Sequence, residues 1–399
     1  MIEVYYGEFL INPIPLELSM NYCSHKCAYC FANLNKPDRR LDAPRLMRFL
    51  ANYKNRNTLA AQLLQQGYPV VISNRTDPFA ASNYIQTLPI LEVLTALGIP
   101  VQFQTKGGKG IDDALQIVGP SVWYITINTL NEAIRKKIEP GAPAVASRFE
   151  LITQLVERGH RVVVGINPAV PEWSAPVEPL IERITGSGAS GVWVECLHLN
   201  KNQEANLSAK ERAAITEPLL SRAKRRRTHP QDVAFYQTVR KTAAAAGLDV
   251  YSVGQPAPSN FFAVYRQVYP KTFPVLQDFI NFCYEHGYNR TRPITFNEFS
   301  AFMGQQLPAG RQRIAHYLGA TARSLWKKWR IPNEMTYRQL LGILWEHPQI
   351  KFSPLRQHNF AYAGLKNDDG WVMVVDETEM PYVLFSPWFD DYFVDIREE

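Results

Sequence analysis

Short apolar runs rich in β-branched residues alternate with amphipathic stretches through the first two thirds of the chain. In the amphipathic stretches, such as residues 90–97 and 149–158, apolar positions recur at helical spacing. Strands that alternate with helices at this rhythm predict parallel β/α units. The expected strands cover residues 16–20, 69–73, 101–104, 122–127, 162–166, 192–196 and 248–251. Six or seven such units predict an α/β fold, a partial or complete parallel (β/α) barrel, with an open doubly wound sheet as the alternative.

The pattern changes after about residue 260. Aromatic-rich helical stretches follow, at residues 279–288 and 311–329, and the sequence Asp368-Asp369-Gly370 is a hairpin signal. We therefore expect a barrel domain over residues 1–258. We expect residues 259–399 to form an accessory region, mostly helical, with a terminal β-hairpin.

Polar or glycine-rich segments follow the expected strands directly. They are residues 73–78, 105–108, 128–129 and 167–168. In a parallel barrel the active site forms where strands end and the following loops begin. The pattern predicts an active site on that face, although loops after strands are commonly polar for solubility alone.

Composition narrows the class of protein. The hydrophobic fraction of 46% in 399 residues argues against global disorder. No apolar run reaches the length of a membrane span, and the first six residues lack the basic-then-apolar order of a signal peptide. We expect a cytoplasmic protein with no membrane partner. The formal charge of +6 permits an anionic partner without requiring one.

Three of the five cysteines, Cys23, Cys27 and Cys30, fall within eight residues just after the first expected strand. In a reducing compartment such a group indicates a metal site rather than a disulfide framework. One loop with this spacing can wrap three corners of a 4Fe–4S cubane and leave the fourth iron open, whereas four thiolates would make an electron-transfer cluster. A structural zinc site, the less favoured alternative, more often shows two separated Cys-x2-Cys pairs.

The spacing, its position after the first strand, and Tyr29 directly before Cys30 resemble the radical SAM superfamily. The resemblance spans about the first 250 residues. It implies that the open iron binds S-adenosylmethionine (SAM) and that one electron breaks the S–C5′ bond of SAM. The product would be a 5′-deoxyadenosyl radical, which takes hydrogen from a substrate. It also implies an external one-electron reductant of the flavodoxin or ferredoxin type.

Later segments resemble the spore photoproduct lyase-like group of that superfamily, namely residues 76–79, 105–107, 138–143 with Arg148, and 167–171. The resemblance implies cofactor-binding roles for Tyr29, Ser73, Asn74, Asp77, Thr105, Lys106, Thr126, Asn128, Glu139, Arg148 and Asn167.

Within this set, Ser73, Asn74 and Asp77 would lie near the methionine amino group, and Thr126 and Asn128 near the ribose or carboxylate. Arg148 would pair with the methionine carboxylate, because guanidinium and carboxylate match bidentately. Purely structural roles are the alternative for each of these residues, such as a turn at Asp77-Pro78.

Cys196 ends an apolar run and could face the barrel mouth, where its thiol would be a hydrogen-atom donor. A buried core cysteine is the commoner role, and we favour it. Tyr251, at the end of the next expected strand, is a second candidate catalytic residue as a radical relay. Cys283 lies in an aromatic helical pattern and is expected in the core.

Five basic residues fall within six positions: Arg222, Lys224, Arg225, Arg226 and Arg227. Such a run can neutralise phosphates of a nucleic acid. It can equally be a solvated helix face.

We expect a radical SAM enzyme that acts on a thymine or a modified pyrimidine in DNA, by lesion reversal or by radical rearrangement of the base. The alternative is a radical SAM enzyme that modifies a peptide or a small molecule. A non-enzymatic metal-binding nucleic-acid module is a third hypothesis.

Overall fold

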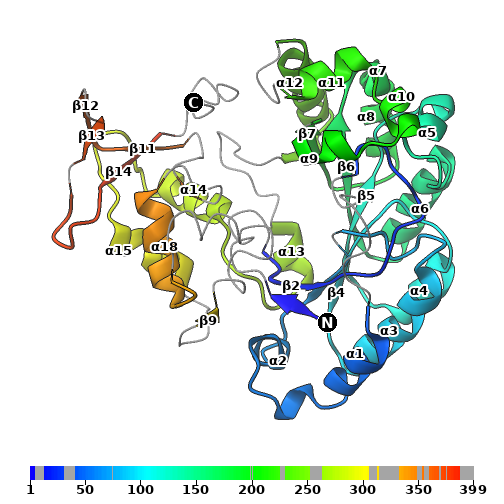
Figure 1. Ribbon diagram of the computed structural model, residues 1–399, viewed down its shortest axis with the longest axis horizontal. Helices are drawn as coiled ribbons and strands as arrows, with labels where there is room; N and C mark the ends of the chain where they lie inside the picture. The colour runs from blue at the N-terminus through cyan, green and yellow to red at the C-terminus, as the bar shows by residue number, and fades with distance from the viewer. Residues whose placement is uncertain are drawn as a thin grey trace.

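The computed structural model describes residues 1–4, 13–30, 41–73, 75–197, 199, 201–224, 230–251, 263–304, 312–313, 332–347, 353–354, 359–367, 370–373 and 375–386. One eight-stranded sheet dominates the half at the right of Figure 1. Its strands are β1 (Glu3–Val4), β2 (Leu16–Leu18), β3 (Val70–Ile72), β4 (Val101–Thr105), β5 (Val122–Thr126), β6 (Arg161–Ala169), β7 (Gly191–Cys196) and β8 (Asp249–Tyr251).

The order of strands in the sheet follows their order in the chain. β1 pairs antiparallel with β2, and every later pair from β2·β3 to β7·β8 is parallel. In a doubly wound sheet, the spatial order of the strands departs from their order in the chain at a switch point. Here the two orders agree along the whole sheet. The predicted parallel (β/α) barrel-type fold is confirmed, and the open doubly wound alternative is wrong.

Helices connect the strands in the barrel half. They are α1 (Ala43–Leu50), η2 (Tyr53–Asn55), α2 (Leu59–Gln65), α3 (Tyr84–Ala96), α4 (Ile111–Ile117), α5 (Glu132–Ile138), α6 (Val145–Glu157), α7 (Pro171–Ser174), α8 (Glu178–Gly186), α9 (Lys201–Asn206), α10 (Ala209–Ala214), α11 (Glu217–Lys224) and α12 (Pro230–Ala245).

Side chains alternate between the two faces of the strands, as the period of two requires. The helix-facing set, for example Phe103, Ile125 and Val194, belongs to the large apolar cluster that the helices share. The interior set forms a separate cluster that includes Val71, Val122, Tyr124, Val163, Trp193 and Tyr251. This alternation fixes which polar residues point into the barrel.

A segment from beyond residue 260 fills the interior at the strand starts. It contains α13 (Ala263–Val268), which lies between the two halves in Figure 1. The Tyr269 hydroxyl donates to Val101 O at 2.7 Å and accepts from Val122 N at 2.8 Å, and Gln102 Nε2 donates to the Tyr265 hydroxyl at 3.2 Å. The boundary expected near residue 258 stays a prediction, but residues after it pack inside the barrel.

The C-terminal part, at the left of Figure 1, gathers α14 (Leu276–Glu285), α15 (Phe296–Gly304) and α18 (Tyr337–Glu346). Phe279, Phe299 and Trp345 pack at its centre, with ring centroids 5.1 and 4.9 Å apart in the pairs that Phe299 makes. Short antiparallel pairs complete it: β9 (Gln312–Arg313) with β10 (Glu334–Met335), β11 (Phe360–Tyr362) with β14 (Val383–Phe385), and β12 (Gly364–Asn367) with β13 (Gly370–Met373). The last pair lies where the sequence predicts a hairpin.

Cys283 is fully buried in the apolar core, as expected. No helix in the described part of the chain is long and apolar enough to cross a membrane.

The Tyr269 hydroxyl yields the first test of this architecture. Tyr269→Phe leaves the buried Val101 carbonyl and Val122 N–H without their partner, so we expect unfolding to become easier by about 1–3 kcal/mol. Denaturant unfolding measures this loss. The control is Tyr284→Phe on the exposed face of α14, which is expected to change stability by less than about 0.5 kcal/mol. Equal effects in the two variants would contradict an interior role for the Tyr269 hydroxyl.

Candidate active site

The three clustered cysteines lie on a loop that follows β2. Cys23 and Cys27 are buried and Cys30 is half-buried. Backbone bonds seat the loop on the connection between α5 and α6: Ala28 N donates to Ile138 O at 2.8 Å, and Gly141 N donates to His25 O at 2.9 Å. The His25 Nδ1 atom lies 3.0 Å from Gly141 O. The α5–α6 connection therefore holds the cysteine loop in place.

Gly141 allows the cysteine loop to pack closely against the α5–α6 connection. A Cβ atom at this position would lie 2.2 Å from Ser24 O and 3.0 Å from the His25 Cα atom. Because both contacts are backbone atoms of the cysteine loop, neither can swing aside as a flexible side chain would. The sequence requires glycine here for close approach of two backbones.

Asp77 ties the turn after β3 to the end of β4. Its Oδ1 atom accepts from Thr105 Oγ1 at 2.7 Å and from Phe79 N at 2.9 Å, and its Oδ2 atom accepts from Lys106 N at 2.6 Å. Oδ2 also lies 3.0 Å from His25 Nε2. Burial alone would raise the pKa of Asp77, but His25 and the hydrogen bonds hold that pKa below its usual range. The Asp77 carboxylate thus links the turn after β3 to the end of β4 and to His25. Its contact with a methionine amino group stays a prediction.

A buried ion pair stands at the centre of the site. The Arg148 Nη2 atom donates to Glu139 Oε2 at 2.5 Å, and both side chains are 1% exposed. Arg148 also donates from Nη1 to Thr126 O at 2.9 Å and from Nη2 to Pro143 O at 3.0 Å. These contacts supply Arg148 with an internal counter-ion, so its pairing with a methionine carboxylate stays a prediction.

The second oxygen of Glu139 faces the cysteine loop. Its Oε1 atom accepts a very short hydrogen bond from the Tyr29 hydroxyl and lies 3.9 Å from Lys106 Nζ. The Lys106 ammonium lies 5.5 Å from the centroid of the Tyr29 ring. Tyr29, the aromatic residue before the third cysteine, is therefore fixed by the same carboxylate that holds Arg148.

Neighbouring charges keep the buried side chains of Glu139 and Lys106 ionised. Burial would raise the pKa of Glu139, but Arg148 and Lys106 hold it below its ordinary value. Burial would lower the pKa of Lys106, yet the nearby Cys27 and Glu139 hold it raised. Burial, together with the Glu139 charge, raises the pKa of Tyr29 well above its usual range. The site thus holds two cations and a carboxylate beside a neutral phenol.

The remaining expected polar residues divide between the interior and the loops. The Ser73 hydroxyl is buried and lies 3.0 Å from Thr76 Oγ1, and Thr126 ends β5. Asn128 Nδ2 donates to the Tyr29 hydroxyl at 2.8 Å, and Asn128 Oδ1 accepts from Asn167 N at 3.0 Å. Asn74 lies outside the described residues.

The donor set fits an iron–sulfur cluster. The thiols lie near enough to interact: burial raises the pKa of Cys27 well above its usual value, and the charges of Cys30 and Cys23 raise it further, against Lys106. In the described part of the chain, no three His, Cys, Asp or Glu side chains converge on a position for one metal ion. Each thiolate of a cubane binds a different iron, so three cysteines on one loop can ligate a cluster without meeting at one point.

Cys196 does not share the interior with Tyr251. It belongs to the helix-facing cluster with Val192 and Val194, whereas Trp193 and Tyr251 lie on the interior face, with ring centroids 3.8 Å apart. Strand alternation turns the Cys196 side chain toward the helices, which is the buried placement that we favoured over one at the barrel mouth. Its role as a hydrogen-atom donor receives no support from this placement, and the relay role of Tyr251 stays a prediction.

Three interior residues escaped the sequence reasoning: Tyr124 on β5, Trp193 on β7 and Glu195 on β7. Trp193 and Glu195 alternate with Val192, Val194 and Cys196 along one strand. The alternation was a usable signal, because a carboxylate inside an apolar strand run marks the face that is not packed against helices.

The basic run lies mostly outside the described residues, which include Arg222 and Lys224 only as the backbone of the end of α11. Arg225, Arg226 and Arg227 fall beyond them.

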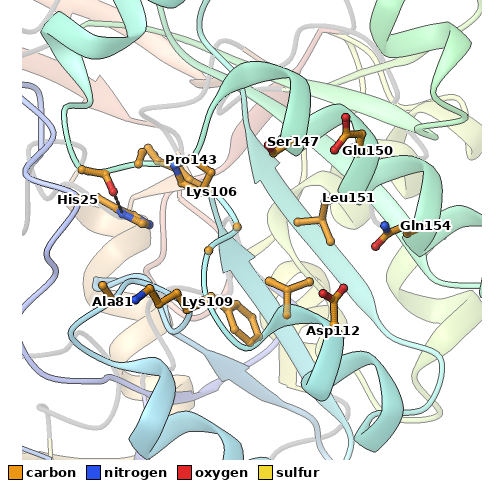
Figure 2. A pocket seen from close by; sticks show the side chains of 16 residues that line it. His25, Ala81, Lys106, Lys109, Asp112, Pro143, Ser147, Glu150, Leu151 and Gln154 are labelled. Atoms are coloured by element: carbon orange, nitrogen blue, oxygen red, sulfur yellow. Dashed lines mark hydrogen bonds between the residues drawn. The ribbon is translucent and has the colours of Figure 1, made fainter.

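A cavity of about 460 Å³ lies beside the cysteine loop, between α4 and α6. Figure 2 shows His25, Lys106 and Pro143 on one side of it and Glu150, Leu151 and Gln154 along α6. Its lining is mixed in charge and polarity. The cavity borders His25, which is a residue of the cysteine loop.

The described chain thus has parallel strands in chain order, a three-cysteine loop after the first of them, and polar side chains at the strand ends. Residues 18–182 match the sequence model of the Radical SAM superfamily. The match covers the cysteine loop and most of the parallel strands, and it agrees with the family expected from the cysteine spacing.

Relatives of similar sequence include an uncharacterized protein of Mycobacterium tuberculosis, 29% identical in an alignment of 196 positions that covers 44% of this chain and 56% of the relative. The "Radical SAM Nalpha-GlyT isomerase" of Pseudomonas phage M6 is 27% identical in an alignment of 183 positions that covers 44% of this chain and 37% of that protein. The chain spans about half the length of the curated relatives it matches.

Solved structures with a partial likeness to this chain include a spore photoproduct lyase variant, 14% identical, with a TM-score of 0.45 over 60% of this chain and 76% of that one. Another is Streptococcus suis SuiB bound to S-adenosylmethionine, 18% identical, with a TM-score of 0.34 over 49% of this chain and 42% of that one.

The seat of the cysteine loop can be tested at Gly141. We expect Gly141→Ala to push the loop off its support, to lower stability by about 1–3 kcal/mol, and to reduce the iron bound after anaerobic reconstitution. Iron and sulfide analysis with denaturant unfolding measures both effects. Gly119→Ala is the control, because nothing lies within 4 Å of a Cβ there. Full iron content in Gly141→Ala would show that the loop does not depend on this contact.

Proposed function

We propose that the chain is a radical SAM enzyme that acts on a modified thymine in DNA. Cys23, Cys27 and Cys30 would hold a 4Fe–4S cluster whose open iron binds SAM. When bound, the cluster would supply the one-electron reduction that cleaves SAM, with the electron received from an external reductant of flavodoxin or ferredoxin type. The observation that carries the proposal is the three-thiol loop, seated against the Glu139–Arg148 pair at the carboxyl ends of parallel strands.

The residues of this chain have distinct tasks in that reaction. The α5–α6 connection holds the cysteine loop through Gly141 and the Ile138 carbonyl. Glu139 fixes Tyr29 and the Lys106 ammonium next to Cys27. A fixed cation at this place favours anionic groups, so Lys106 is suited to meet the carboxylate of SAM or the charge of the thiolates.

Rearrangement is favoured over lesion reversal. The relative from Pseudomonas phage M6 bears the name of an isomerase. In a rearrangement, 5′-deoxyadenosine can return the hydrogen atom that its radical took, so no protein thiol is required. Cys196 faces the helices rather than the interior, which leaves lesion reversal without an evident donor among the described cysteines.

A peptide or small-molecule substrate is the alternative. Many peptide-modifying members of the superfamily carry a cysteine-rich C-terminal extension for further clusters. After residue 258 this chain has only Cys283, which is buried in the apolar core. One thiol cannot ligate another all-cysteine cluster, and this favours the DNA proposal.

The radical chemistry is tested by replacing the cysteines one at a time. Cys23→Ala, Cys27→Ala and Cys30→Ala are each expected to reduce 5′-deoxyadenosine formation to background, because each removes one cluster ligand. Cys196→Ala is the matched control, and it should cleave SAM and form product normally. Chromatography of reactions with SAM and a chemical reductant measures both. Full activity in any of the three loop variants would overturn the cluster assignment. A stalled product in Cys196→Ala would indicate that Cys196 is a hydrogen-atom donor.

The DNA proposal is tested by salt-dependent binding. Replacing Arg225, Arg226 and Arg227 by Gln is expected to weaken binding to single- or double-stranded DNA by about tenfold or more and to flatten its salt dependence, because fewer counterions are released. The double variant Lys136→Gln/Lys137→Gln, which removes two exposed positive charges from α5, serves as the control. Absence of DNA binding by the unmodified protein would favour the peptide or small-molecule alternative.

A further inference from the structure

The outer face of the cysteine loop is framed by two helices. On one side of the loop, the Ser82 hydroxyl, just before α3, donates to Tyr22 O at 2.7 Å. On the other side, the end of α5 and the connection that follows it bind the loop through the Ile138 carbonyl and the Gly141 N–H. Between these supports the loop exposes Tyr22 and Lys26 to solvent. These two residues directly precede the first two cysteines of the loop.

Two large apolar side chains are exposed on this face. Tyr22 is 42% exposed, and Ile85, in the first turn of α3, is 70% exposed. The Ser82 bond holds the start of α3 against Tyr22, so the two side chains come from adjoining segments. The described part of the chain exposes five large apolar side chains, and two of the five lie here. Exposed apolar groups that gather in one place mark interaction sites.

The exposed charges around the loop are all positive. Four described segments frame the loop: residues 21–27, 79–86, 106–110 and 136–144. Their exposed charged side chains are Lys26, Lys109, Lys136 and Lys137. The one carboxylate within these segments, Glu139, is 1% exposed. The Lys109 ammonium lies 5.9 Å from the centroid of the Tyr84 ring, which places this cation at the start of α3.

Lys26 has a left-handed backbone, with a φ of 51°. This conformation costs a residue with a side chain about 1–2 kcal/mol, whereas glycine adopts it readily. The loop therefore carries a cation on its exposed face in spite of that cost. Backbone strain of this kind gathers at functional sites, so the position indicates a use for the charge.

The cavity of about 460 Å³ borders the same face. Figure 2 shows His25, Ala81 and Lys109 at one end of the cavity, and Asp112 and Glu150 at the other. The carboxylates thus lie away from the cysteine loop, and the end with the cation adjoins it. A molecule that covers this face has room to approach the loop beside His25.

We propose that this face is the docking surface for a small acidic one-electron carrier protein. The inference rests on the proposed function, whose reaction consumes an electron from outside the chain. An apolar centre with a charged rim is the usual anatomy of a protein–protein interface, and the four lysines complement an acidic partner. One electron leaves the carrier, which is oxidised, and reduces the cluster; no proton or further reactant is needed. Electron transfer requires close approach, and docking here brings the carrier against the loop that holds all three ligands.

A nucleic acid would also complement the lysines. The exposed side chains of Tyr22 and Ile85 favour a protein, because the backbone of a duplex offers charge rather than an apolar partner.

The test follows reduction of the reconstituted full chain by its visible absorbance, under anaerobic stopped-flow conditions. The reductants are a reduced acidic flavodoxin and, separately, dithionite. In the triple variant Lys109→Glu/Lys136→Glu/Lys137→Glu, we expect reduction by flavodoxin at low salt to slow by about tenfold or more and to lose its salt dependence. Reduction by dithionite should stay within about twofold, because a small reductant requires no docking surface.

The control variant Lys54→Glu/Lys241→Glu/Lys271→Glu changes the net charge equally at exposed lysines outside the four segments, and should be reduced as the unmodified protein is. Ile85→Ser should raise the flavodoxin concentration needed for half-maximal rate by about threefold or more, with the salt dependence kept. Lys26→Asn removes one charge from the loop with a residue that tolerates the left-handed conformation, and should also slow flavodoxin. If the triple variant fails to bind iron, these two single variants decide the question.

Reduction by flavodoxin that is unchanged in the triple variant and in Ile85→Ser, or slowed equally in the control variant, overturns the inference. Weaker DNA binding by the triple variant with unchanged flavodoxin reduction assigns the face to a nucleic acid and also overturns it. In both cases, a cluster that dithionite still reduces leaves the proposed function standing. A chain that holds no reducible cluster contradicts the proposed function itself, so the two failures are distinguishable.

Discussion

The geometry of the site depends on the buried pair between Glu139 and Arg148. Two charges that are each 1% exposed are costly to remove from water unless each finds a complementary partner. Arg148 meets this condition with Glu139 and with carbonyls at the end of β5 and at Pro143. Glu139 meets it with Arg148, Tyr29 and Lys106. Loss of one partner of such a pair costs on the order of 3–5 kcal/mol, so the network is either complete or strongly disfavoured.

That network joins two parts of the chain that have little regular structure of their own, the cysteine loop and the α5–α6 connection. The cysteine loop follows a strand of only three residues, and the α5–α6 connection contains no strand at all. Glu139 and Arg148 link both to β5, while Asp77 links the turn after β3 to β4 and to His25. The loops are thereby fixed relative to strands whose register is set by the sheet, and this keeps the three thiols and the mouth in one arrangement.

Local patterns predicted the alternation of strands and helices and the cysteine loop well, because both depend on residues that are close together in the sequence. The expected strand at 101–104 is observed as Val101–Thr105, and Asp77, Lys106 and Glu139 all converge near the loop. The partners within this set were not predictable, since Arg148 and Glu139 meet only when β5 and the α5–α6 connection are in place. The orientation of Cys196 depended on strand phase. Tyr269 reaches the interior from beyond the expected boundary, and no pattern along the chain records that contact.

The same difference between local and distant information explains why three interior residues of β5 and β7 were not predicted. Sequence motifs drew attention to loops after strands, where Lys106 and Glu139 lie, and these residues cluster on the β4–β5 side. Tyr124, Trp193 and Glu195 lie within strands, where an apolar role is the usual one, and only their shared face reveals them. Lys106 and Arg148 lie beside the cysteine loop, and Glu195 lies on β7. The charged side chains at the strand ends are thus divided by sign between two regions of the sheet, and this division follows from strand phase and from contacts between distant segments rather than from any single motif.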